Sequence, residues 1–301
     1  MRVDELNERF AIPDTVQFEA GAGGLPRAVI TAAAAAGHVY LHGAHVTHHR
    51  AAGQQPLLFL SSRSPFAEGR AIRGGVPVIF PWFGSRDGDP GAPDHGFART
   101  AEWTLESVEW CGDGSVAVVL GLAPDGGTRR LWPHDFRLRH RVVFGEQLEM
   151  TLTVENTSSS SFTFEEAMHS YLLVGDAAEV SVTGLGGTTY IDKTDQMRRK
   201  TLSAEPLRLD AATDRVFLDT RARCVVDDPG LSRRLSVEKT GSATTVLWNP
   251  WAERARAMAD LGPEEWRHML CVETANAADN AIALGPGERH AMTARLRVAA
   301  D

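Results

Sequence analysis

The chain is short of cysteine and has no long apolar run. Its three cysteines, Cys111, Cys224 and Cys271, are widely spaced, so they predict neither a disulfide framework nor a CxxC metal pair. This usage is typical of a reducing compartment. The first thirty residues lack a basic start followed by a long apolar core, and the Ala32–Ala36 run is too short to span a bilayer. We therefore expect a cytoplasmic protein that does not enter a membrane.

Several common signatures are missing as well. No GxSxG appears, which argues against an α/β-hydrolase. The glycine runs that begin at Gly21 and Gly184 complete neither GxGxxG nor a P-loop, and no βαβ pattern surrounds them. The net charge of −8 and a pI near 5.8 argue against nucleic acid or an anionic membrane as the main partner. An anionic small molecule remains possible as a ligand. Arginines close to it can attract it more strongly than the negative net charge of the whole protein repels it.

The main pattern in the sequence is an alternation of apolar and polar residues with a period of two. In Gln147–Glu155, the residues Leu148, Met150, Leu152 and Val154 alternate with polar ones, which predicts a half-buried β-strand. Irregular strands are expected between Val39 and Val46, with the break near Gly43. Turn signals separate further expected strands at Trp103–Trp110, Val116–Leu122, Arg137–Phe144, Phe162–Val174, Glu179–Thr183, Arg234–Lys239, Thr244–Trp248, Met269–Thr274 and Ala291–Val298.

The predicted fold class is all-β, an antiparallel sandwich or barrel with a few short helices. The clearest helix is Trp251–Leu261, between Asn249-Pro250 and Gly262-Pro263. We expect an N-terminal arm over residues 1–26 that contains a short helix near Asp4–Phe10. Large all-β folds reach 301 residues as one unit, and no repeat, linker or break in composition divides the chain. A single domain over residues 1–301 is therefore expected.

The stretch Ile72–Arg99 gathers two arginines, a histidine and an aromatic pair on irregular backbone. Pro77 and Pro81 enclose a short apolar run, and because proline lacks an N–H this run cannot be an ordinary central strand. Functional groups often lie on such segments when a rigid scaffold carries them. A surface loop whose charges meet only water is the alternative, and the residues alone leave both open.

Two further side chains are candidates for chemistry. His169 shares one face of its strand with Glu165, Ala167 and Tyr171 under a period of two. A histidine in such surroundings is either a catalyst or a hydrogen-bonded core residue. Glu273 lies in a short apolar strand, where a carboxylate is costly to bury unless it is paired or functional. An internal ion pair or a position at the strand's rim is the alternative.

Four histidines cluster early in the chain, at His42, His45, His48 and His49. Their spacing matches neither HExxH nor a zinc finger, and no cysteine or carboxylate joins them. We expect solvent-facing strand residues here and no metal site.

Taken together, these segments resemble the glucose-6-phosphate 1-epimerases, also called hexose-6-phosphate mutarotases, of the aldose 1-epimerase superfamily. The matching segments run in order from about residue 40 to the end, so the resemblance covers nearly the whole chain except the arm. They are IRGGVPVIFPWFG, HGFAR, WPHDF, MHSYLLVGD, VTGLGGTTYIDK, TDRVFL, LWNPW and CVETA. The resemblance implies the large antiparallel β-sandwich of the galactose mutarotase type, in agreement with the strand pattern.

The resemblance also implies site residues. They are His169 as general acid, Glu273 as general base, His95 and Asp214 at positions that bind sugar hydroxyls, and Arg73 and Arg99 as phosphate ligands. Trp82 would pack against the sugar or only form a wall of the site. Asp94 departs from the pattern, because some members carry a glutamine there. Either its carboxylate points away from the phosphate, or the preference for phosphate is weakened.

The implied reaction interconverts the α and β anomers of an aldohexose 6-phosphate, with glucose 6-phosphate expected. Glu273 removes the C1 hydroxyl proton while His169, as imidazolium, protonates the ring oxygen, and the opened sugar recloses on its other face. Nearby carboxylates would favour that imidazolium. Neither a metal nor an organic cofactor is required, and the expected partner is a small sugar phosphate bound by a monomer.

Two other classes remain open. One is an aldose 1-epimerase that acts on neutral sugars, and the other is a carbohydrate-binding sandwich without catalysis. A metalloenzyme built on the early histidines is more remote. Which hexose is preferred depends on hydroxyl geometry that the residues do not specify.

Overall fold

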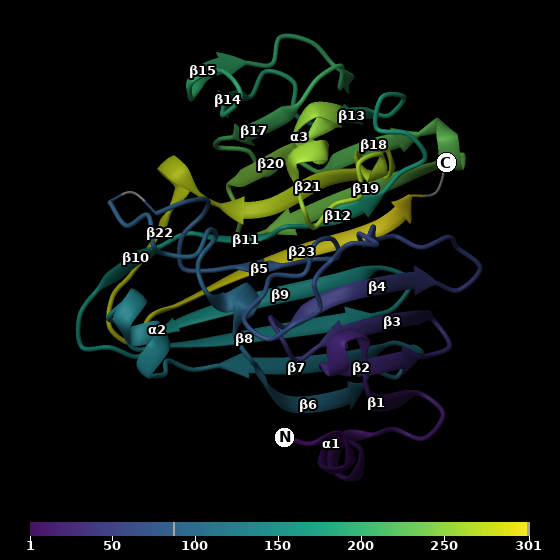
Figure 1. The fold of residues 1–301 in the computed structure, drawn as a ribbon, viewed down its shortest axis with the longest axis vertical. Coiled ribbons are helices and arrows are strands. Elements are labelled where there is room, and N and C mark those ends of the chain that lie inside the picture. Colours follow the sequence, from purple (N-terminus) through teal and green to yellow (C-terminus); the bar gives the residue numbers. More distant parts are fainter. Residues whose placement is uncertain (87, 300–301) are drawn as a thin grey trace.

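Two large antiparallel sheets pack against each other and form the body of the molecule (Figure 1). The computed structural model describes residues 1–86 and 88–299. One core cluster, extending in sequence from Leu6 to Leu296, takes buried side chains from both sheets. This arrangement confirms the predicted all-β sandwich.

The larger sheet has nine strands among the described residues. In spatial order they are β16 (Leu207–Arg208), β13 (Ser181–Thr183), β18 (Cys224–Asp228), β19 (Arg233–Thr240), β23 (Arg289–Ala299), β9 (Leu148–Asn156), β8 (Phe136–Phe144), β7 (Val116–Leu122) and β6 (Thr104–Trp110). Strand β9 alternates buried and partly buried residues along its whole length, as its sequence predicts. Its apolar side chains therefore face the core, and its polar ones face outward.

The second sheet carries the residues of most interest. Its strands in the described residues are β15 (Arg198–Thr201), β14 (Thr189–Asp192), β17 (Thr213–Phe217), β20 (Thr244–Asn249), β21 (Met269–Asn276), β11 (Glu166–Met168) and β5 (Val78–Ile79), and β12 (Tyr171–Leu173) also pairs with β21. Every residue of β21 is buried. One face of this strand meets the core, and the other is covered by loops and short helices.

Smaller elements complete the fold. A four-stranded sheet contains β1 (Val16–Ala20), β2 (Pro26–Thr31), β3 (Ala35–Tyr40) and β4 (His45–Ala51), and β10 (Phe162–Phe164) pairs with β22 (Ile282–Leu284). The α-helices are α1 (Val3–Phe10), α2 (Gly126–Leu131) and α3 (Trp251–Ala257), and 3-10 turns lie at Ala22–Gly24, Ala98–Thr100, Pro229–Leu231, Glu265–His268 and Ala278–Asn280. No helix in the described part of the chain has the length and hydropathy needed to cross a bilayer.

Several expected elements have different limits. Helix α3 ends at Ala257, four residues before the expected end, and α2 was not expected. The expected strand Phe162–Val174 is divided into β10, β11 and β12. Strand β1 lies within residues 1–26, where only a helix was expected, and it pairs with β2. Helix α1 matches that expected helix.

The segment around β5 is not a surface loop. The carbonyls of Pro77 and Pro81 accept hydrogen bonds from the N–H groups of His169 (3.0 Å) and Glu165 (2.9 Å). The two prolines thus serve as acceptors on either side of β5, which is the end strand of its sheet, and an edge is where proline is tolerated. Gly75 has φ of 60°, and a Cβ there would lie 2.2 Å from a backbone oxygen of β4. Only glycine allows this close approach.

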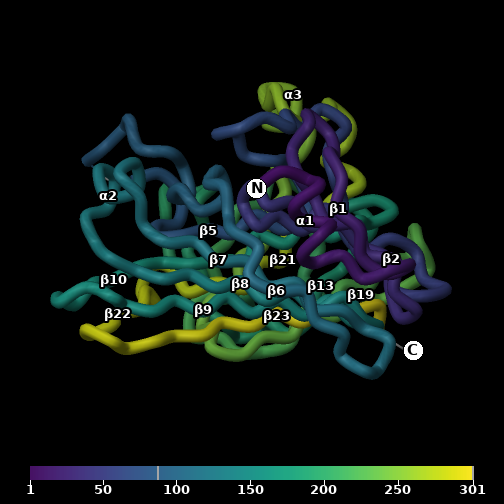
Figure 2. Tube along the Cα trace, turned by 90° about the horizontal axis from the view of Figure 1, so that it is seen from below, coloured from purple at the N-terminus to yellow at the C-terminus, as the bar shows by residue number. Residues whose placement is uncertain are grey.

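The outward face of the eight-stranded sheet is covered by α3. Figure 2 shows α3 on the opposite side of the molecule from β9, β23 and β19 of the larger sheet. Ala255 of α3 packs with Tyr171, Met269 and Cys271 in a second apolar cluster. The functional candidates lie on this same outward face.

Candidate active site

The two proposed catalytic side chains meet on this face. His169 follows β11, and Glu273 lies in β21, the neighbouring strand. The His169 Nε2 atom is 3.4 Å from Glu273 Oε1, and their side chains are only 8% and 1% exposed. The core side of the same chain segment is occupied by Met168 and Leu172. The period of two in the sequence therefore predicted correctly that His169 faces away from the core.

Burial changes the proton affinity of both members of this pair. It lowers the pKa of His169 well below its ordinary value of 6.5, and the cations Arg73 and Arg99 and the ring of His95 lower it further. Burial also raises the pKa of Glu273 well above 4.5, and the charge of Asp214 adds to this rise. The proton that the pair shares is therefore favoured on Glu273. This differs from the expected imidazolium, because burial and, after it, the neighbouring His95, Arg73 and Arg99 lower the pKa of His169.

His95 is held in a defined orientation beside this pair. Its ring centroid is 5.7 Å from that of His169. The Gly84 N–H donates to His95 Nδ1 at 3.2 Å, and the His95 N–H donates to the Gly84 carbonyl. Burial lowers the pKa of His95 well below 6.5, so the ring is neutral and its proton is on Nε2. His95 can therefore donate a hydrogen bond through Nε2.

The loop that carries Gly84 is held by Glu165. One Glu165 oxygen accepts from the Phe83 N–H at 2.8 Å, and the other accepts from the Ala278 N–H at 2.7 Å. The Phe83 ring stands edge-on to the His95 ring at 4.9 Å. Glu165 thus connects the loop of His95 to the turn that follows β21.

Arg73 is already engaged by protein groups. Its Nε and Nη2 atoms donate to one oxygen of Asp260 at 3.1 and 2.9 Å. Its Nη1 donates to the Tyr171 hydroxyl at 2.9 Å, and the Tyr171 ring stacks on His169 with centroids 4.7 Å apart. The hydrogen bonds with Asp260 and Tyr171 keep Arg73 charged, and its pKa is raised despite burial.

The Arg99 side chain forms fewer hydrogen bonds with protein groups than the Arg73 side chain does. Its Nη2 donates to the Asp94 carbonyl at 2.7 Å, and its Nε is buried without a partner. Within residues 1–86 and 88–299 no carboxylate pairs with it. Burial lowers the pKa of Arg99 from its ordinary value. A guanidinium with open donors in such a place is suited to an anion.

Asp214 lies on the same face, beyond Glu273. In the sheet register Asp214 is opposite Trp248, and Trp248 is opposite Cys271, two residues before Glu273. The nearest cation to Asp214 is Lys193, whose Nζ is 4.0 Å from Asp214 Oδ2. Burial raises the pKa of Asp214, and the Lys193 charge opposes this rise.

Trp82 is set apart from the other expected residues. It is 8% exposed, packs in the main core against Phe97, and donates its indole N–H to the Pro93 carbonyl at 3.0 Å. Trp82 was expected either to pack against the sugar or to form a wall of the site, and its burial favours the second role. Its neighbour Phe83 is the aromatic residue that contacts His95.

Sequence reasoning did not assign roles to four further residues near the site. Tyr171 had a signal, since its period-two face was the face of His169. Lys193 and Trp248 lie in segments that carried the resemblance, but nothing in their residue type separated them from the rest. Asp260 is in a loop and had no signal at all. The four residues are Tyr171, Lys193, Trp248 and Asp260.

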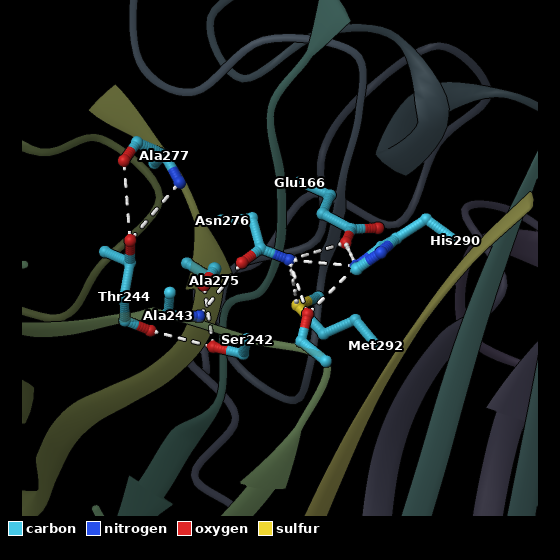
Figure 3. Close-up of polar contacts among 10 residues, drawn as sticks. Glu166, Ser242, Ala243, Thr244, Ala275, Asn276, Ala277, His290 and Met292 are labelled. Atoms are coloured by element: carbon cyan, nitrogen blue, oxygen red, sulfur yellow. Dashed lines mark hydrogen bonds and ion pairs between the residues drawn. The ribbon is translucent and has the colours of Figure 1, made fainter. Parts of the chain in front are cut away.

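A buried polar network lies three residues from each catalytic side chain (Figure 3). Glu166 and Asn276 are paired across β11 and β21, and the Asn276 Nδ2 donates to Glu166 Oε1 at 2.9 Å. His290 Nε2 is 3.1 Å from the same oxygen. The Glu166 hydrogen bond and charge raise the pKa of His290 above 6.5. The network joins the strands of the catalytic pair to β23 of the other sheet.

Three of the four early histidines do not face solvent, so the expectation is wrong for them, while His48 is partly exposed. The Nε2 atoms of His42, His45 and His49 bond to backbone carbonyls at 2.7, 2.7 and 2.9 Å, and all three residues are buried. Burial lowers the pKa of His45 to about 3 and that of His49 to about 4. Their role is to satisfy carbonyls in the core. Across the described part of the chain, no group of three or more side chains is placed to hold a metal ion.

Comparison with known proteins places this site in context. The sequence profile of the family described as aldose 1-epimerase matches residues 28–297. A protein of Escherichia coli (strain K12), provisionally named glucose-6-phosphate 1-epimerase, is 38% identical over 239 residues, which are 79% of each chain. A protein of Cenchrus ciliaris with the same provisional name is 34% identical over 83% of this chain and 77% of its own.

The fold has a close counterpart among solved structures. The crystal structure of a provisionally assigned mutarotase from Salmonella typhimurium superposes with a TM-score of 0.90 and 30% sequence identity. The match covers 97% of this chain and 96% of the other. Nearly all of the sandwich is therefore shared with that protein.

Proposed function

Because the chain belongs to the aldose 1-epimerase family, we propose that it interconverts the α and β anomers of an aldohexose 6-phosphate, with glucose 6-phosphate as the preferred substrate. The observation that carries the proposal is the 3.4 Å contact between His169, which follows β11, and Glu273 of the neighbouring strand β21. An acid and a base held this close can act on the two oxygens of one anomeric carbon. The provisional names of the relatives support the phosphate ester as substrate.

The reaction needs two proton transfers and one reversible bond cleavage. Glu273, as carboxylate, takes the proton of the C1 hydroxyl, and the C1–O5 bond breaks as C1 becomes a carbonyl. His169, as imidazolium, gives its proton to O5. Rotation about C1–C2 turns the other carbonyl face toward O5, and both transfers then run in reverse. Each positioned group contributes about 10²- to 10⁴-fold.

The phosphate group has a second role in this scheme. In the free protein the shared proton is favoured on Glu273, because burial raises the pKa of Glu273 and both burial and nearby cations lower the pKa of His169. A phosphate bound at Arg99 brings negative charge to the same region and offsets those cations. This raises the pKa of His169 and favours the proton on the imidazole. Substrate binding thus produces the acid and the base that ring opening requires.

Arg99 is the proposed main ligand of the phosphate. Its Nε is buried without a partner, whereas two Arg73 nitrogens are occupied by Asp260. Arg73 contributes charge and holds Tyr171 against His169. His95 donates through Nε2 to an oxygen of the sugar, because its Nδ1 is an acceptor for Gly84.

One observation favours a neutral sugar as the alternative substrate. Arg73 is neutralised by Asp260 at 2.9 Å, which leaves Arg99 as the open arginine of the expected pair. A single arginine gives less discrimination between a phosphate ester and a free sugar than two do. An aldose 1-epimerase that accepts unphosphorylated hexoses is therefore the second candidate.

Anomer exchange measured by NMR tests these alternatives. Wild type, His169→Asn, Glu273→Gln and Arg99→Ala are compared on glucose 6-phosphate and on glucose, each against the uncatalysed rate. The proposal expects fast exchange of the phosphate ester, a loss of about 10²-fold or more in the first two variants, and a selective loss on the ester in Arg99→Ala. Arg198→Ala is the matched control, because Arg198 is 64% exposed on the outer strand β15.

Two results would contradict the proposal. Equal rates on both sugars, unaffected by Arg99→Ala, would indicate an epimerase of neutral sugars. Exchange of neither sugar above the uncatalysed rate would indicate a carbohydrate-binding protein without this activity.

A further inference from the structure

The turn between β3 and β4 lies against the two chain segments that carry Arg73 and Arg99. It consists of residues 41–44 and is followed by His45, the first residue of β4. Residues 41–45 include two of the early histidines, which the proposed reaction does not use. Their contacts reach the backbone on both sides of the arginine pair.

On one side, this turn holds the segment of Arg73. The His42 ring donates through Nε2 to the Arg70 carbonyl at 2.7 Å, and the His45 ring donates through Nε2 to the Gly74 carbonyl, also at 2.7 Å. A carbonyl oxygen only accepts, so the proton on Nε2 is fixed by these contacts. Arg73 therefore lies between two backbone carbonyls that the histidines hold in place.

On its other side, the same turn contacts the segment of Arg99. The Gly43 N–H donates to the Ala101 carbonyl at 2.7 Å. Gly43 has a φ of 70°, and a Cβ there would lie 2.5 Å from the Arg99 carbonyl oxygen. Only glycine combines this conformation with so close an approach. One short turn thus sets the backbone positions of both arginines.

The two arginines need such a connection because their charges repel each other. Burial and, after it, the charge of Arg73 lower the pKa of Arg99. The repulsion favours a larger distance between the two segments when no anion is bound. Backbone contacts that fix this distance in advance spare the energy of bringing the two charges together on binding.

His45 suits this position because it adds no charge of its own. Burial lowers its pKa to about 3, so the ring is neutral near pH 7. The side chain is completely buried, and water cannot compete for its hydrogen bond with the Gly74 carbonyl. A protonated ring at this place would add to the repulsion between the arginines.

Resting on the proposed function, we propose that His45 is a positioning residue, which holds Arg73 at the distance from Arg99 at which both act on one phosphate group. Residues 41–45 form a brace between the two arginine segments. The brace acts on the reaction through the arginines, and therefore on phosphate esters more than on free sugars.

Anomer exchange measured by NMR on glucose 6-phosphate and on glucose tests the brace. Leucine cannot donate to the Gly74 carbonyl, so the segment of Arg73 should move in His45→Leu. Because a small misplacement can cost about 10²-fold, kcat/KM should fall by about 10- to 100-fold on the ester and by no more than about threefold on glucose. His45→Gln should keep most of the activity, because its amide nitrogen replaces Nε2 as the donor.

Binding of inorganic phosphate, followed by ³¹P NMR, gives a readout that does not depend on catalysis. The dissociation constant should rise by about 10-fold in His45→Leu and by less than about threefold in His45→Gln. If His45→Leu does not fold, Gly43→Ala is measured instead. Its added Cβ displaces Arg99 from the other side of the brace, so it should weaken phosphate binding in the same way.

His49→Leu is the matched control. His49 is buried in the same strand, and its Nε2 donates to the Gly145 carbonyl at 2.9 Å. Gly145 lies in the hairpin between β8 and β9 of the larger sheet. The variant thus removes a buried hydrogen bond of the same kind, and it should lower stability without changing phosphate binding or the preference for the ester.

The brace is supported if the preference for the ester and the binding of phosphate both fall in His45→Leu, return in His45→Gln and persist in His49→Leu. An equal loss on both sugars, or unchanged phosphate binding, overturns it and leaves the proposed epimerase intact. A wild-type protein that binds no phosphate overturns it as well. A wild-type protein that accelerates neither sugar overturns the proposed function itself, while phosphate binding by the variants still decides on the brace.

Discussion

The Tyr171 ring lies parallel to the His169 ring, with centroids 4.7 Å apart and an angle of 9° between the planes. The Tyr171 hydroxyl in turn accepts a hydrogen bond from Arg73. The imidazole is thus packed against an aromatic surface that is itself held by a cation. Such a position disfavours a charged imidazole until negative charge arrives from outside the protein.

A free anion should therefore activate the enzyme toward a sugar that has no phosphate. Inorganic phosphite or phosphate bound at Arg99 offsets the cations near His169 and favours its protonation. We expect kcat/KM for glucose to rise by at least about 10-fold. This is less than the full rate enhancement that a positioned general acid contributes, about 10²- to 10⁴-fold. Saturable acceleration is measured by NMR, after subtraction of the exchange that the anion causes without enzyme.

Arg99→Ala provides the control for this activation. The variant should show no saturable effect of the anion, while Arg198→Ala should behave as wild type. Acceleration that persists in Arg99→Ala would place the anion elsewhere and remove the proposed link between phosphate and His169.

The acid limb of the pH profile should respond to the two charges beside Glu273. Asp214 raises the pKa of Glu273 and Lys193 lowers it. Because Glu273 must lose its proton to act as base, activity rises as pH passes through its raised pKa. Asp214→Asn should therefore move the limb of kcat/KM to lower pH, and Lys193→Met should move it to higher pH.

The position of the limb is compared between variants, because the substrate itself also titrates. The substrate phosphate has its own ionisation near pH 6, and this is the same in every variant. Lys200→Met should leave the limb in place. Shifts of the same sign in both variants would show that the limb does not report Glu273.

The sequence predicted those parts of the fold that have a periodic signal. Strand β9 alternates along its length, and both its limits and its buried face were correct to within a residue or two. Strand β17 was not predicted as a strand, because its burial does not alternate and its charged residues resemble a turn. The faces of His169 and Tyr171 followed from a period of two, so they too were predictable.

Other features depend on contacts that are distant in sequence. His45 was expected to face solvent, yet it is fully buried, and its ring N–H donates at 2.7 Å to the Gly74 carbonyl, 29 residues away. Asp260 reaches Arg73 across 187 residues, and no local pattern marks either partner. Charges in loops have no period, so their pairing is decided by the tertiary fold alone.

Glu165 should act on catalysis by positioning, since it holds the loop of His95. Glu165→Ala removes acceptors for the N–H groups of Phe83 and Ala278. A small displacement of His95 should lower kcat/KM by about 10- to 100-fold. Glu165→Gln should lose less, because one amide oxygen can still accept a hydrogen bond while the amide nitrogen cannot.

Nitrogen NMR of the His95 ring distinguishes this role from simple instability. In wild type, Nδ1 should have the shift of an acceptor and Nε2 that of a protonated nitrogen, and Glu165→Ala should mix the two tautomers. Glu179→Ala, at an exposed position, is the control. Lower activity with unchanged ring shifts would argue against positioning through His95.

The network of Glu166, Asn276 and His290 makes the stability of the sandwich depend on pH (Figure 3). Glu166 raises the pKa of His290 above 6.5. A raised folded pKa means that the protonated His290 stabilises the fold fully below about pH 6.5, and that this contribution is lost as pH rises through the raised value. The hydrogen bond of a charged pair is worth about 1.5–3 kcal/mol.

Urea unfolding at several pH values measures this contribution. The free energy of unfolding of wild type should fall by up to that amount, relative to His290→Gln, between about pH 6 and pH 9. Glutamine does not titrate, so its variant provides the baseline. His268→Gln is the control, because His268 is exposed and its ring bonds to the uncharged Gly175 carbonyl. A constant difference between wild type and His290→Gln across this range would mean that His290 is not charged in the folded protein.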